Sequence, residues 1–350
     1  LKKYSKGMDK MKLMRTEDAV GQVLCHDITQ IIKGVTKDAV FRKGHIITEE
    51  DIPVLLSVGK DHIYIWENNE NMLHENDAAK ILYDMCANEH MTPSEIKEGK
   101  IELIAECDGL LKVDTERLNA VNALGEMMIA CRHGNFPVKK GDKIAGTRII
   151  PLIIEKEKME RAKKAAGEEP IFELIPFKKM KAAIVNTGNE VFYGRIKDTF
   201  TPVIIEKLKE YGAEVVGHVV SDDNHEHITA AIQKFLDEGV DMVLCTGGMS
   251  VDPDDRTPLA IKNTGAEIVT YGAPVLPGAM FLLSYYGEKK RPVIGLPGCV
   301  MYAKRTIFDL VLPRVMAGEI LKKSDIDILG EGGLCLNCPV CTFPNCGFGK

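Results

Sequence analysis

Glycines and aspartates are concentrated in one short stretch, TGGMSVDPDDRT, which follows the apolar run DMVLC. Its glycines are Gly247 and Gly248, and its aspartates are Asp252, Asp254 and Asp255. Glycine lets a backbone N–H approach a phosphate oxygen closely, and Ser250 adds a hydroxyl donor at the same place. Carboxylates beside bound phosphate would repel it unless a cation such as Mg²⁺ lies between them. The stretch therefore predicts a phosphate site with an adjoining Mg²⁺ site.

Acidic residues and glycines also follow three other apolar, strand-like runs. Thr187, Gly188 and Glu190 follow MKAAIVN, Asp222 and Asp223 follow AEVVGHVVS, and Pro297 and Gly298 follow RPVIGL. In an open parallel sheet the carboxyl ends of the strands lie along one edge, where ligands bind. We therefore expect all of these residues to face a single crevice.

Helix capping is the alternative explanation for the aspartates. Asp254 or Asp255 would cap a helix that begins near Thr257, and Asp222 or Asp223 would cap one that begins near His225. For an isolated Gly-Gly-x-Ser turn this explanation is as good as a phosphate site. The repetition of acidic residues after successive strands favours the metal site.

The four runs named above alternate with helix-like segments over residues 177–322. One of these segments is HITAAIQKFLDEG, in which Ile228, Ile232 and Phe235 recur at helical spacing before Gly239 ends the helix. Alternation of this kind predicts a parallel sheet with helices on both faces. We therefore predict an α/β, three-layer domain in this part of the chain.

The rest of the chain is predicted to form three further parts. Residues 11–154 are rich in strand-like runs, with helices expected near residues 76–86 and 115–129. The Lys/Glu-rich residues 155–170 predict an exposed helix, and residues 155–176 a linker. Residues 323–350 form a cysteine-rich tail. The β-rich region therefore precedes the α/β domain, and the tail follows it.

Composition excludes several classes of protein. The 350 residues carry a net charge of −6, which gives no basic footprint for nucleic acid. No apolar run approaches the roughly 20 residues of a membrane helix, and no signal peptide is recognisable. We expect a cytoplasmic protein, in which six scattered cysteines are reduced core residues: Cys25, Cys86, Cys107, Cys131, Cys245 and Cys299.

Four further cysteines are crowded into the tail sequence CLNCPVCTFPNC, at positions 335, 338, 341 and 346. The four metal ligands we predict are Cys335, Cys338, Cys341 and Cys346. The series is nearer to the C-x2-C-x2-C pattern of ferredoxins than to a zinc ribbon, so an iron–sulfur cluster is expected ahead of Zn²⁺. A disordered or disulfide-forming tail is the alternative.

The residues at the predicted crevice together resemble a known family. The resemblance rests on TGNE at 187–190, SDD at 221–223, GGMSV at 247–251 with Asp255, PG at 277–278 and LPG at 296–298. In order and approximate spacing these motifs resemble the molybdopterin-binding domain of the molybdenum cofactor biosynthesis proteins. KGHIITEEDIPVLLSVG, in the N-terminal region, resembles the small β-domain of the molybdopterin molybdenumtransferases (MoeA-like proteins).

The resemblance implies a function and a set of site residues. In that family molybdate is inserted into the dithiolene of molybdopterin or its adenylate, with Mg²⁺ assistance and hydrolysis of the adenylate. Glu190, Asp222 and Asp255 match the acidic catalytic positions. The positions expected to bind the pterin nucleotide are Thr187, Gly188, Gly247, Gly248, Ser250, Pro297 and Gly298. The resemblance also implies a homodimer, with a molybdopterin nucleotide and molybdate as partners.

The chain departs from the family pattern in its N-terminal half. The family carries an Asp-Gly-Tyr-Ala stretch there, for which the only candidate in this chain is Cys107-Asp108-Gly109-Leu110. Two alternatives to the transferase therefore stay open. One is a non-catalytic carrier or sensor of the molybdenum cofactor, with the tail as its output. The other is an enzyme of the same fold that acts on a different nucleotide.

Overall fold

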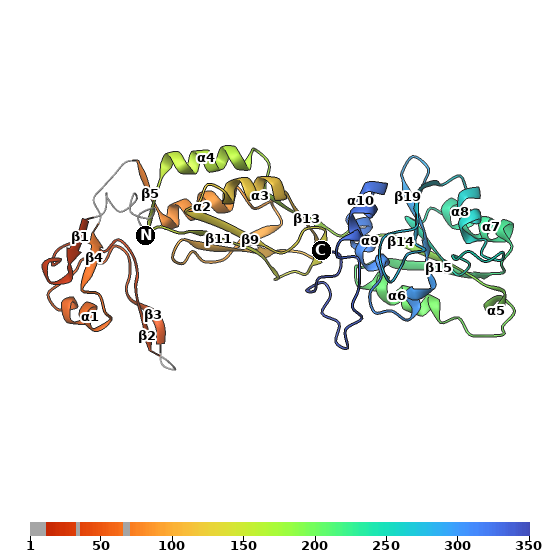
Figure 1. Cartoon of the computed structure of the whole chain (residues 1–350), viewed down its shortest axis with the longest axis horizontal. Coiled ribbons are helices and arrows are strands. Elements are labelled where there is room, and N and C mark those ends of the chain that lie inside the picture. The colour runs from red at the N-terminus through yellow and green to blue at the C-terminus, as the bar shows by residue number, and fades with distance from the viewer. Residues whose placement is uncertain (1–11, 33–35, 66–70) are drawn as a thin grey trace. The chain divides into compact units, whose positions relative to one another are not determined.

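The structure, a computed structural model, describes residues 12–32, 36–65 and 71–350 (Figure 1). Residues 11, 33–35 and 66–70 of the predicted N-terminal region therefore lie outside the described residues. The chain divides into two compact units, each made of several segments. Unit 1 comprises Leu1–Glu106, Val113–Arg132 and Gly141–Glu173, and unit 2 comprises Cys107–Lys112, His133–Lys140 and Leu174–Lys350.

Unit 2 is built on a six-stranded sheet with the strand order β15-β14-β16-β19-β18-β17. The strands are β14 (Lys181–Thr187), β15 (Glu214–Ser221), β16 (Met242–Thr246), β17 (Glu267–Tyr271), β18 (Leu282–Tyr286) and β19 (Arg291–Leu296). The four predicted strands, β14, β15, β16 and β19, are parallel. The prediction of a wholly parallel sheet is wrong near one edge, where β18 runs antiparallel to both of its neighbours, β17 and β19. The connection between β18 and β19, residues 287–290, is too short for the crossover that parallel strands need.

Helices cover both faces of this sheet, so the predicted three-layer α/β architecture is confirmed (Figure 1). Side chains alternate between faces along a strand. Ala182 and Ile184 of β14 accordingly join one core, and Ala183 and Val185 join the other. The first core also takes in α6 (Phe200–Lys209), α9 (Ile307–Met316) and α10 (Lys323–Asp327), and the second takes in α7 (His225–Asp237) and α8 (Thr257–Asn263).

The helix α7 forms where the sequence predicts it. Asn224 caps its amino end, because the Asn224 side chain accepts a hydrogen bond from the N–H of Glu226 at 2.8 Å. The predicted apolar stripe, Ile228, Ile232 and Phe235, is buried against the sheet. Each such side chain contributes about 1.5–3 kcal/mol through its burial. Burial of the stripe therefore holds α7 on the sheet.

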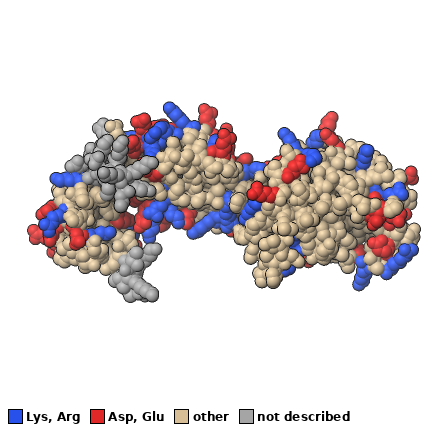
Figure 2. Space-filling model, viewed as in Figure 1, with Lys and Arg blue, Asp and Glu red and all other residues tan. Residues whose placement is uncertain are grey.

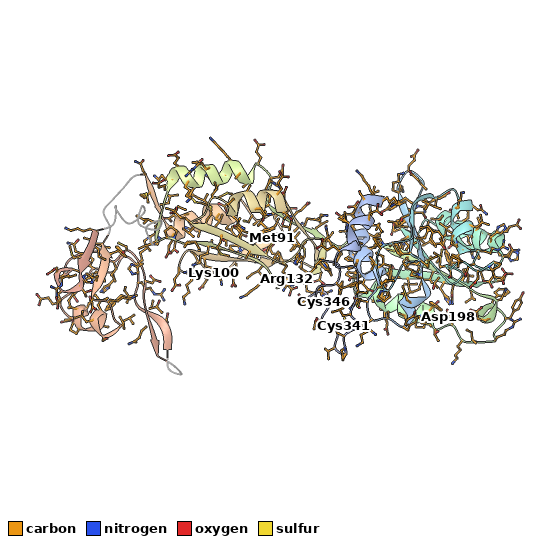
Figure 3. The ribbon with its side chains drawn as sticks, viewed as in Figure 1. Met91, Lys100, Arg132, Asp198, Cys341 and Cys346 are labelled. Atoms are coloured by element: carbon orange, nitrogen blue, oxygen red, sulfur yellow. The ribbon has the colours of Figure 1, made fainter. Side chains whose placement is uncertain are left out.

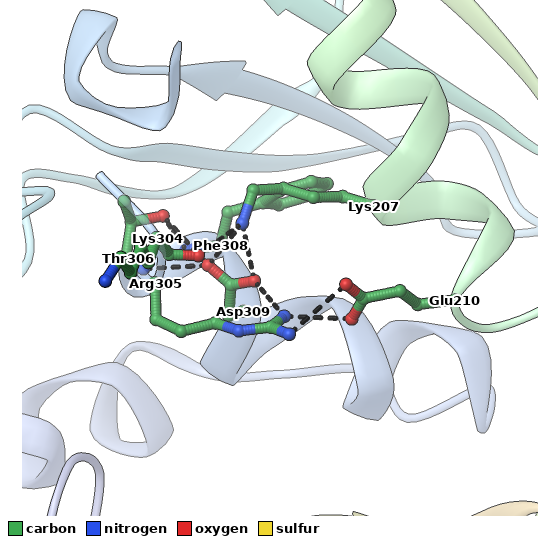
Figure 4. A network of polar contacts seen from close by, with 7 residues as sticks. All are labelled: Lys207, Glu210, Lys304, Arg305, Thr306, Phe308 and Asp309. Atoms are coloured by element: carbon green, nitrogen blue, oxygen red, sulfur yellow. Dashed lines mark hydrogen bonds and ion pairs between the residues drawn. The ribbon is translucent and has the colours of Figure 1, made fainter. Parts of the chain in front are cut away.

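A buried charge network fixes the start of α9 (Figure 4). The Lys207 ammonium lies 2.7 and 2.9 Å from the two carboxylate oxygens of Asp309, and both side chains are less than 10% exposed. Arg305 donates to the same carboxylate at 2.8 Å and to Glu210 at 2.8 Å. The N–H of Thr306 also donates to Asp309 at 2.7 Å. One carboxylate therefore anchors α6, α9 and the segment that leads into α9.

The cysteine-rich tail packs onto unit 2. Gly333 accepts a hydrogen bond from the N–H of Leu276, and Cys335 returns one to the carbonyl of Leu276, both at 2.8 Å. Phe348 is buried in the first core, and Phe343 packs at its edge. The described tail is therefore anchored at both ends, and the alternative of a disordered tail is wrong. All ten cysteines are described and free, so the disulfide alternative has no support in the structure.

A three-stranded sheet with the strand order β10-β8-β13 accompanies the main sheet. Its strands are β8 (Gly109–Val113), β10 (Phe136–Val138) and β13 (Phe172–Pro176). Phe136 of β10 belongs to the first core of unit 2, and its ring lies 5.9 Å from that of Phe343. The short segments Cys107–Lys112 and His133–Lys140, which lie within the predicted N-terminal region, thus belong to unit 2.

Unit 1 begins with a small β-rich part. Its elements are β1 (Lys12–Arg15), a 3₁₀ turn (Thr16–Asp18), β2 (Ile28–Ile32), β3 (Thr36–Phe41), α1 (Asp51–Ser57) and β4 (His62–Ile65). β1 pairs with β4, and β2 with β3, both antiparallel. A compact core that includes Leu24, Ile47, Leu55 and Ile63 holds this part together.

The rest of unit 1 combines a four-stranded antiparallel sheet, of order β6-β7-β11-β9, with three helices. The strands here are β5 (Met72–His74), β6 (Met91–Pro93), β7 (Lys100–Ala105), β9 (Met127–Cys131), β11 (Lys143–Ile149) and β12 (Ile153–Glu155). The helices are α2 (Glu75–Asp84), α3 (Thr115–Asn122) and α4 (Lys156–Ala166).

Two of the helices differ from their predictions. The helix expected over 115–129 ends at Asn122, whose side-chain amide pairs with both backbone groups of Ile129 in β9. The helix of the predicted linker, α4, is present but is not wholly exposed, because Met159, Ala162 and Ala166 are fully buried. One methionine and two small alanines are enough to form a buried face on a helix whose other residues are mostly charged. No helix in the described ranges is long and apolar enough to cross a membrane.

Candidate functional site

A crevice of about 1050 Å³ lies at the carboxyl ends of β14, β16 and β19. The chain passes from β14 outward to β15 and then returns to β16 on the other side of β14. The strand order thus reverses between β14 and β16, and ligands bind at such switch points in open α/β sheets. The topology alone therefore favours this crevice as the place where a ligand would bind.

The structure brings nearly all of the predicted site residues to this one crevice. The predicted residues that line it are Thr187, Gly188, Glu190, Gly247, Gly248, Ser250, Asp255, Pro297 and Gly298. Asp222 does not line it. The Asp222 carboxylate instead lies 2.9 Å from Nδ1 of His227 and accepts a hydrogen bond from the N–H of Asn224. The strand β15 contributes Asp223 to the crevice in its place.

The turn after β16 can be made only by glycine. Gly247 has φ of +85°, and a Cβ atom there would clash with the carbonyl oxygen of Thr187. Gly248 has φ of +56°, and a Cβ there would lie 3.0 Å from Oγ1 of Thr257. Both glycines are therefore required by conformation and by space, and the backbone at this turn stays accessible from the crevice.

Hydroxyl groups fasten the turn from behind. Oγ1 of Thr257 donates to the carbonyl of Gly247 at 2.8 Å and lies 3.0 Å from Oγ1 of Thr187. The Tyr271 hydroxyl donates to the carbonyl of Met249 at 2.9 Å. The backbone carbonyls of Gly247 and Met249 are thus already hydrogen-bonded within the domain. Rigid support of this kind is what a binding loop needs to keep its N–H groups in place.

The aspartates of this loop do not cap the helix α8, so the capping alternative is wrong there. The cap position of α8 is Arg256, which makes no side-chain cap hydrogen bond. The Asp255 carboxylate instead accepts from the N–H of Asp252 at 2.9 Å and closes the turn between them. For α7 the cap is Asn224 rather than Asp222 or Asp223. Asp223, Asp252, Asp254 and Asp255 therefore line the crevice without capping a helix.

Asp223 ties two of the crevice loops together. Its carboxylate accepts a hydrogen bond from the N–H of Asn189 at 3.0 Å. Burial raises the pKa of Asp223, and the hydrogen bond from Asn189 opposes that shift. The negative charges of Glu190, Asp254 and Asp222 raise the pKa further. Mutually repelling carboxylates are arranged around this point, and a bound cation would relieve the repulsion.

Figure 2 shows red acidic side chains gathered at the end of unit 2 where the short helix α5 (Asn189–Phe192) lies. No group of three His, Cys, Asp or Glu side chains among the described residues is close enough to hold an ion alone. Mg²⁺ in nucleotide sites is usually held by one or two carboxylates together with the phosphates of the ligand. The carboxylates present fit that kind of site.

Cationic residues that the sequence interpretation missed line the same crevice. Arg195 and Lys197 lie on the exposed loop between α5 and α6. The Arg195 guanidinium lies 5.4 Å from the centre of the Tyr193 ring. This loop ends at Asp198, labelled in Figure 3, which accepts hydrogen bonds from the N–H groups of Phe200 and Thr201. The signal in the sequence was the run RIKD after Gly194, whose two cations could have been read as anion ligands.

The fold and the site together define an α/β domain with a glycine turn and an acidic rim in one crevice. The comparisons with known proteins agree. Residues 183–317 match the family model described as "Probable molybdopterin binding domain", so the predicted resemblance is confirmed for this domain. Residues 13–67 match a model described as "Domain of unknown function (DUF8806)".

The chain is similar to curated proteins over part of its length. A molybdopterin molybdenumtransferase of Synechococcus elongatus is 28% identical over 182 residues, covering 49% of this chain and 42% of that protein. A CinA-like protein of Mycobacterium avium is 34% identical over 90 residues, covering 25% of this chain and 21% of that protein. The chain thus spans less than half of the length of these curated relatives.

Solved structures with detectable similarity include two proteins of molybdenum cofactor biosynthesis. The molybdopterin biosynthesis enzyme MoaB from Thermus thermophilus has a TM-score of 0.32 at 21% identity, covering 41% of this chain and 99% of that chain. A molybdenum cofactor biosynthesis protein from Pyrococcus furiosus has a TM-score of 0.26 at 14% identity, covering 88% of this chain and 63% of that chain.

Proposed function

We propose that this protein binds molybdopterin or its adenylate in the crevice of unit 2 and promotes Mg²⁺-dependent insertion of molybdate. One observation carries the proposal. A glycine turn that leaves its backbone accessible faces an acidic rim within one crevice, in the domain that matches the molybdopterin-binding model. The four cysteines of the tail are not needed for this activity.

Some residues of the crevice would bind the ligand's phosphates, and others would attract its negative charge. The backbone N–H groups at Gly247 and Gly248, with the Ser250 hydroxyl, would donate to phosphate oxygens of the ligand. Arg195 and Lys197 would attract the anionic ligand from the opposite loop. Thr187, Gly188, Pro297 and Gly298 form the walls. The hydrogen bonds of Thr257 and Tyr271 to the glycine turn support this assignment for the turn itself.

The carboxylates would hold Mg²⁺ between themselves and the ligand's phosphates. Glu190, Asp223 and Asp255 face the crevice and are the residues that we assign to this task. Asp222, whose carboxylate pairs with His227, would act by positioning the loop that carries Asp223. When bound, Mg²⁺ neutralises phosphate charge and so eases hydrolysis of the adenylate.

The direct test supplies purified protein with adenylylated molybdopterin, molybdate and Mg²⁺. We expect AMP release together with reconstitution of an apo-molybdoenzyme. In the variants Asp255→Asn and Glu190→Gln we expect the rate of AMP release to fall at least about 100-fold, while pterin binding changes little, because shape and hydrogen-bonding capacity are kept. Glu226→Gln, an exposed acidic residue of α7 outside the crevice, is the matched control. Binding without AMP release in the unmodified protein would contradict the proposal.

A non-catalytic carrier or sensor of the cofactor is the second candidate, and one observation favours it. Asp108, in the only counterpart of the Asp-Gly-Tyr-Ala stretch, already accepts hydrogen bonds from Nζ of Lys139 at 2.9 Å and from the N–H of Lys140 at 2.8 Å. Its carboxylate is thus used within the fold. A carrier would bind the pterin equally well with Asp255→Asn and would release no AMP.

A third candidate keeps the crevice and changes the nucleotide. The similarity to a CinA-like protein supports this candidate, and competition between the pterin adenylate and simple adenine or nicotinamide nucleotides would test it. The homodimer implied by the resemblance and the cytoplasmic location expected from the composition are part of the same proposal. Light scattering on the purified full chain tests the dimer, and fractionation of cells tests the location.

A further inference from the structure

The tail encloses a second cavity, of about 260 Å³, which is separate from the crevice. All four tail cysteines, Cys335, Cys338, Cys341 and Cys346, line this tail cavity. Cys335 and Cys346 are half-buried and pack against the main core of unit 2, whereas Cys338 and Cys341 are exposed. Figure 3 labels Cys341 and Cys346. The predicted ligands are therefore brought to one place by the fold.

The anchors of the tail hold the cysteine-bearing loop in this shape. The hydrogen bonds between Leu276 and the 333–335 segment fix its beginning, and the burial of Phe348 fixes its end. Between the first two cysteines, Asn337 has φ of +49°, a conformation that asparagine tolerates better than most residues. Cys335 and Cys338, on either side of it, both line the cavity.

The walls of the cavity combine apolar and cationic groups. Leu334, Leu336, Phe343 and Phe348 supply apolar surface. Lys304 donates to the carbonyls of Cys338 at 3.1 Å and Pro339 at 2.6 Å, and the Arg305 guanidinium lies 5.0 Å from the centre of the Phe343 ring. Clusters bound by thiolates carry negative charge, and low solvent exposure with nearby positive charge stabilises them.

We propose that Cys335, Cys338, Cys341 and Cys346 bind a [4Fe–4S] cluster in the tail cavity. Three of the four cysteines follow the C-x2-C-x2-C spacing of bacterial ferredoxins. Among the described residues no three His, Cys, Asp or Glu side chains are close enough together to hold one ion. The proposal therefore rests on the spacing of the cysteines and on the cavity that all four of them line.

The cavity adjoins the chain segment that leads from the crevice. Pro297, Gly298 and Tyr302 line the crevice. Lys304 and Arg305, two and three residues after Tyr302, line the tail cavity. The buried Asp309 network holds this segment in place. A cluster in the tail would therefore lie beside a rigidly fixed segment of unit 2, rather than on a free chain end.

The test is anaerobic reconstitution of the full chain with sulfide and equal amounts of Fe²⁺ and Fe³⁺, which together supply the [4Fe–4S]²⁺ state without a further oxidant, followed by removal of unbound metal. We expect about four iron and about four sulfide per chain, with the broad visible absorption of a cluster and an electron paramagnetic resonance signal after reduction by dithionite. Cys338→Ser and Cys341→Ser alter exposed positions, so both variants should fold and should lose most of the iron and the visible band. Cys131→Ser, a half-buried thiol in β9, is the matched control and should keep both.

Several outcomes would overturn the proposal. Uptake of Zn²⁺ with no sulfide-containing iron centre would show a zinc site, and no metal uptake would show a purely structural tail. Iron content unchanged in both tail variants would place the cluster elsewhere. Thermal unfolding of the metal-free variants, compared with the metal-free parent, separates loss of the cluster from loss of the fold. No pterin is present in this experiment, so its result is independent of the function proposed for the crevice.

Discussion

The crevice and the tail cavity lie in the same unit but are built in different ways. The crevice is lined by residues spread from Asn186 to Tyr302, which meet because four parallel strands end along one edge. The four thiols of the tail cavity come from residues 335–346 alone. The crevice is wide and acidic, whereas the tail cavity is small and largely apolar.

The difference separates two kinds of dependence on the sequence. The crevice depends on long-range topology, so a single altered strand end leaves most of its wall in place. The tail cavity depends on local spacing, and on two anchors that keep a short loop against the core. We therefore expect damage to the crevice to be local and graded, and damage to the tail to be all or none. The segment between Gly298 and Thr306 contributes to both, because Gly298 and Tyr302 line the crevice and Lys304 and Arg305 line the tail cavity.

The largest effect is expected from Asp309→Ala, which should break both regions together. The substitution leaves the Lys207 ammonium and the Arg305 guanidinium without the buried carboxylate that they share. Removal of one partner from a buried ion pair costs about 3–5 kcal/mol, so the free energy of unfolding should fall by that amount. Chemical denaturation measures it.

The matched control for that variant is Asp327→Ala, which removes an exposed partner of Lys323. Exposed pairs contribute about 0.2–1 kcal/mol, so this variant should unfold almost as the parent does. Equal losses in the two variants would show that the Asp309 network does not hold the segment. Retention of both pterin binding and tail iron in a folded Asp309→Ala protein would contradict its shared role.

A second variant, Gly247→Ala, should break the crevice alone. A methyl group at this position would clash with the carbonyl oxygen of Thr187, and φ is +85°. We expect the affinity for the pterin nucleotide to fall at least about 10-fold and the free energy of unfolding to fall by about 1–3 kcal/mol. Iron bound in the tail should stay at the parent level. Calorimetric titration and iron analysis measure the two effects.

Gly265 provides the matched control, because it has the same φ of +85° with open space around it. Gly265→Ala therefore carries the backbone strain without the clash. Equal effects of the two substitutions on pterin binding would show that backbone strain, rather than the close approach to β14, explains the loss. That result would contradict the prediction that the clash with Thr187 disrupts the crevice.

Much of the crevice could be predicted from the sequence, for a physical reason. Strand ends and glycine turns are local signals, and the rule that parallel strands end along one edge converts them into a single site. Asp222 was the exception among the acidic residues. Asp222 and Asp223 follow the same strand, but Asp222 pairs with His227 and Asp223 lines the crevice. The sequence alone does not show which of the two faces the crevice.

Other features depended on tertiary contacts that no local pattern reports. The strands β18 and β17 extend one edge of the sheet, with β18 antiparallel to both neighbours, and the alternation of strands and helices did not reveal this. The helix expected to reach residue 129 ended at Asn122, because its side chain found the backbone of Ile129. The cysteine spacing identified the tail as a unit, but the anchors at Leu276 and in the core became visible only in the structure.

The smallest expected effect compares two carboxylates of unit 2 whose pKa values shift in opposite directions. Asp223 lines the crevice, and Asp198 lies between Lys197 and Thr199, which also line it. Burial raises the pKa of Asp198, but hydrogen bonds from Thr201 and Phe200 outweigh it, so the pKa lies below its usual value. Asp198 therefore stabilises the fold above the pKa of the unfolded chain, near 4, and this contribution is lost as the pH falls through the lower, folded value. Burial and neighbouring carboxylates raise the pKa of Asp223, so its charge destabilises the fold increasingly as the pH rises through that raised value.

The substitutions Asp198→Asn and Asp223→Asn should therefore change stability in opposite directions at neutral pH. Asp198→Asn should lower the melting temperature and Asp223→Asn should raise it, because an amide can keep the hydrogen bond from Asn189 without the repelled charge. Both differences from the parent should shrink as the pH is lowered. The difference for Asp223→Asn should shrink first, as the pH falls through the raised pKa of Asp223, and the difference for Asp198→Asn only below about 4, as the pH falls toward the lowered pKa of Asp198. Melting curves between pH 3 and pH 7 measure this. A lower melting temperature for both variants at neutral pH would show that Asp223 is held by its hydrogen bonds more than it is repelled, and the acidic rim would then need no cation to be stable.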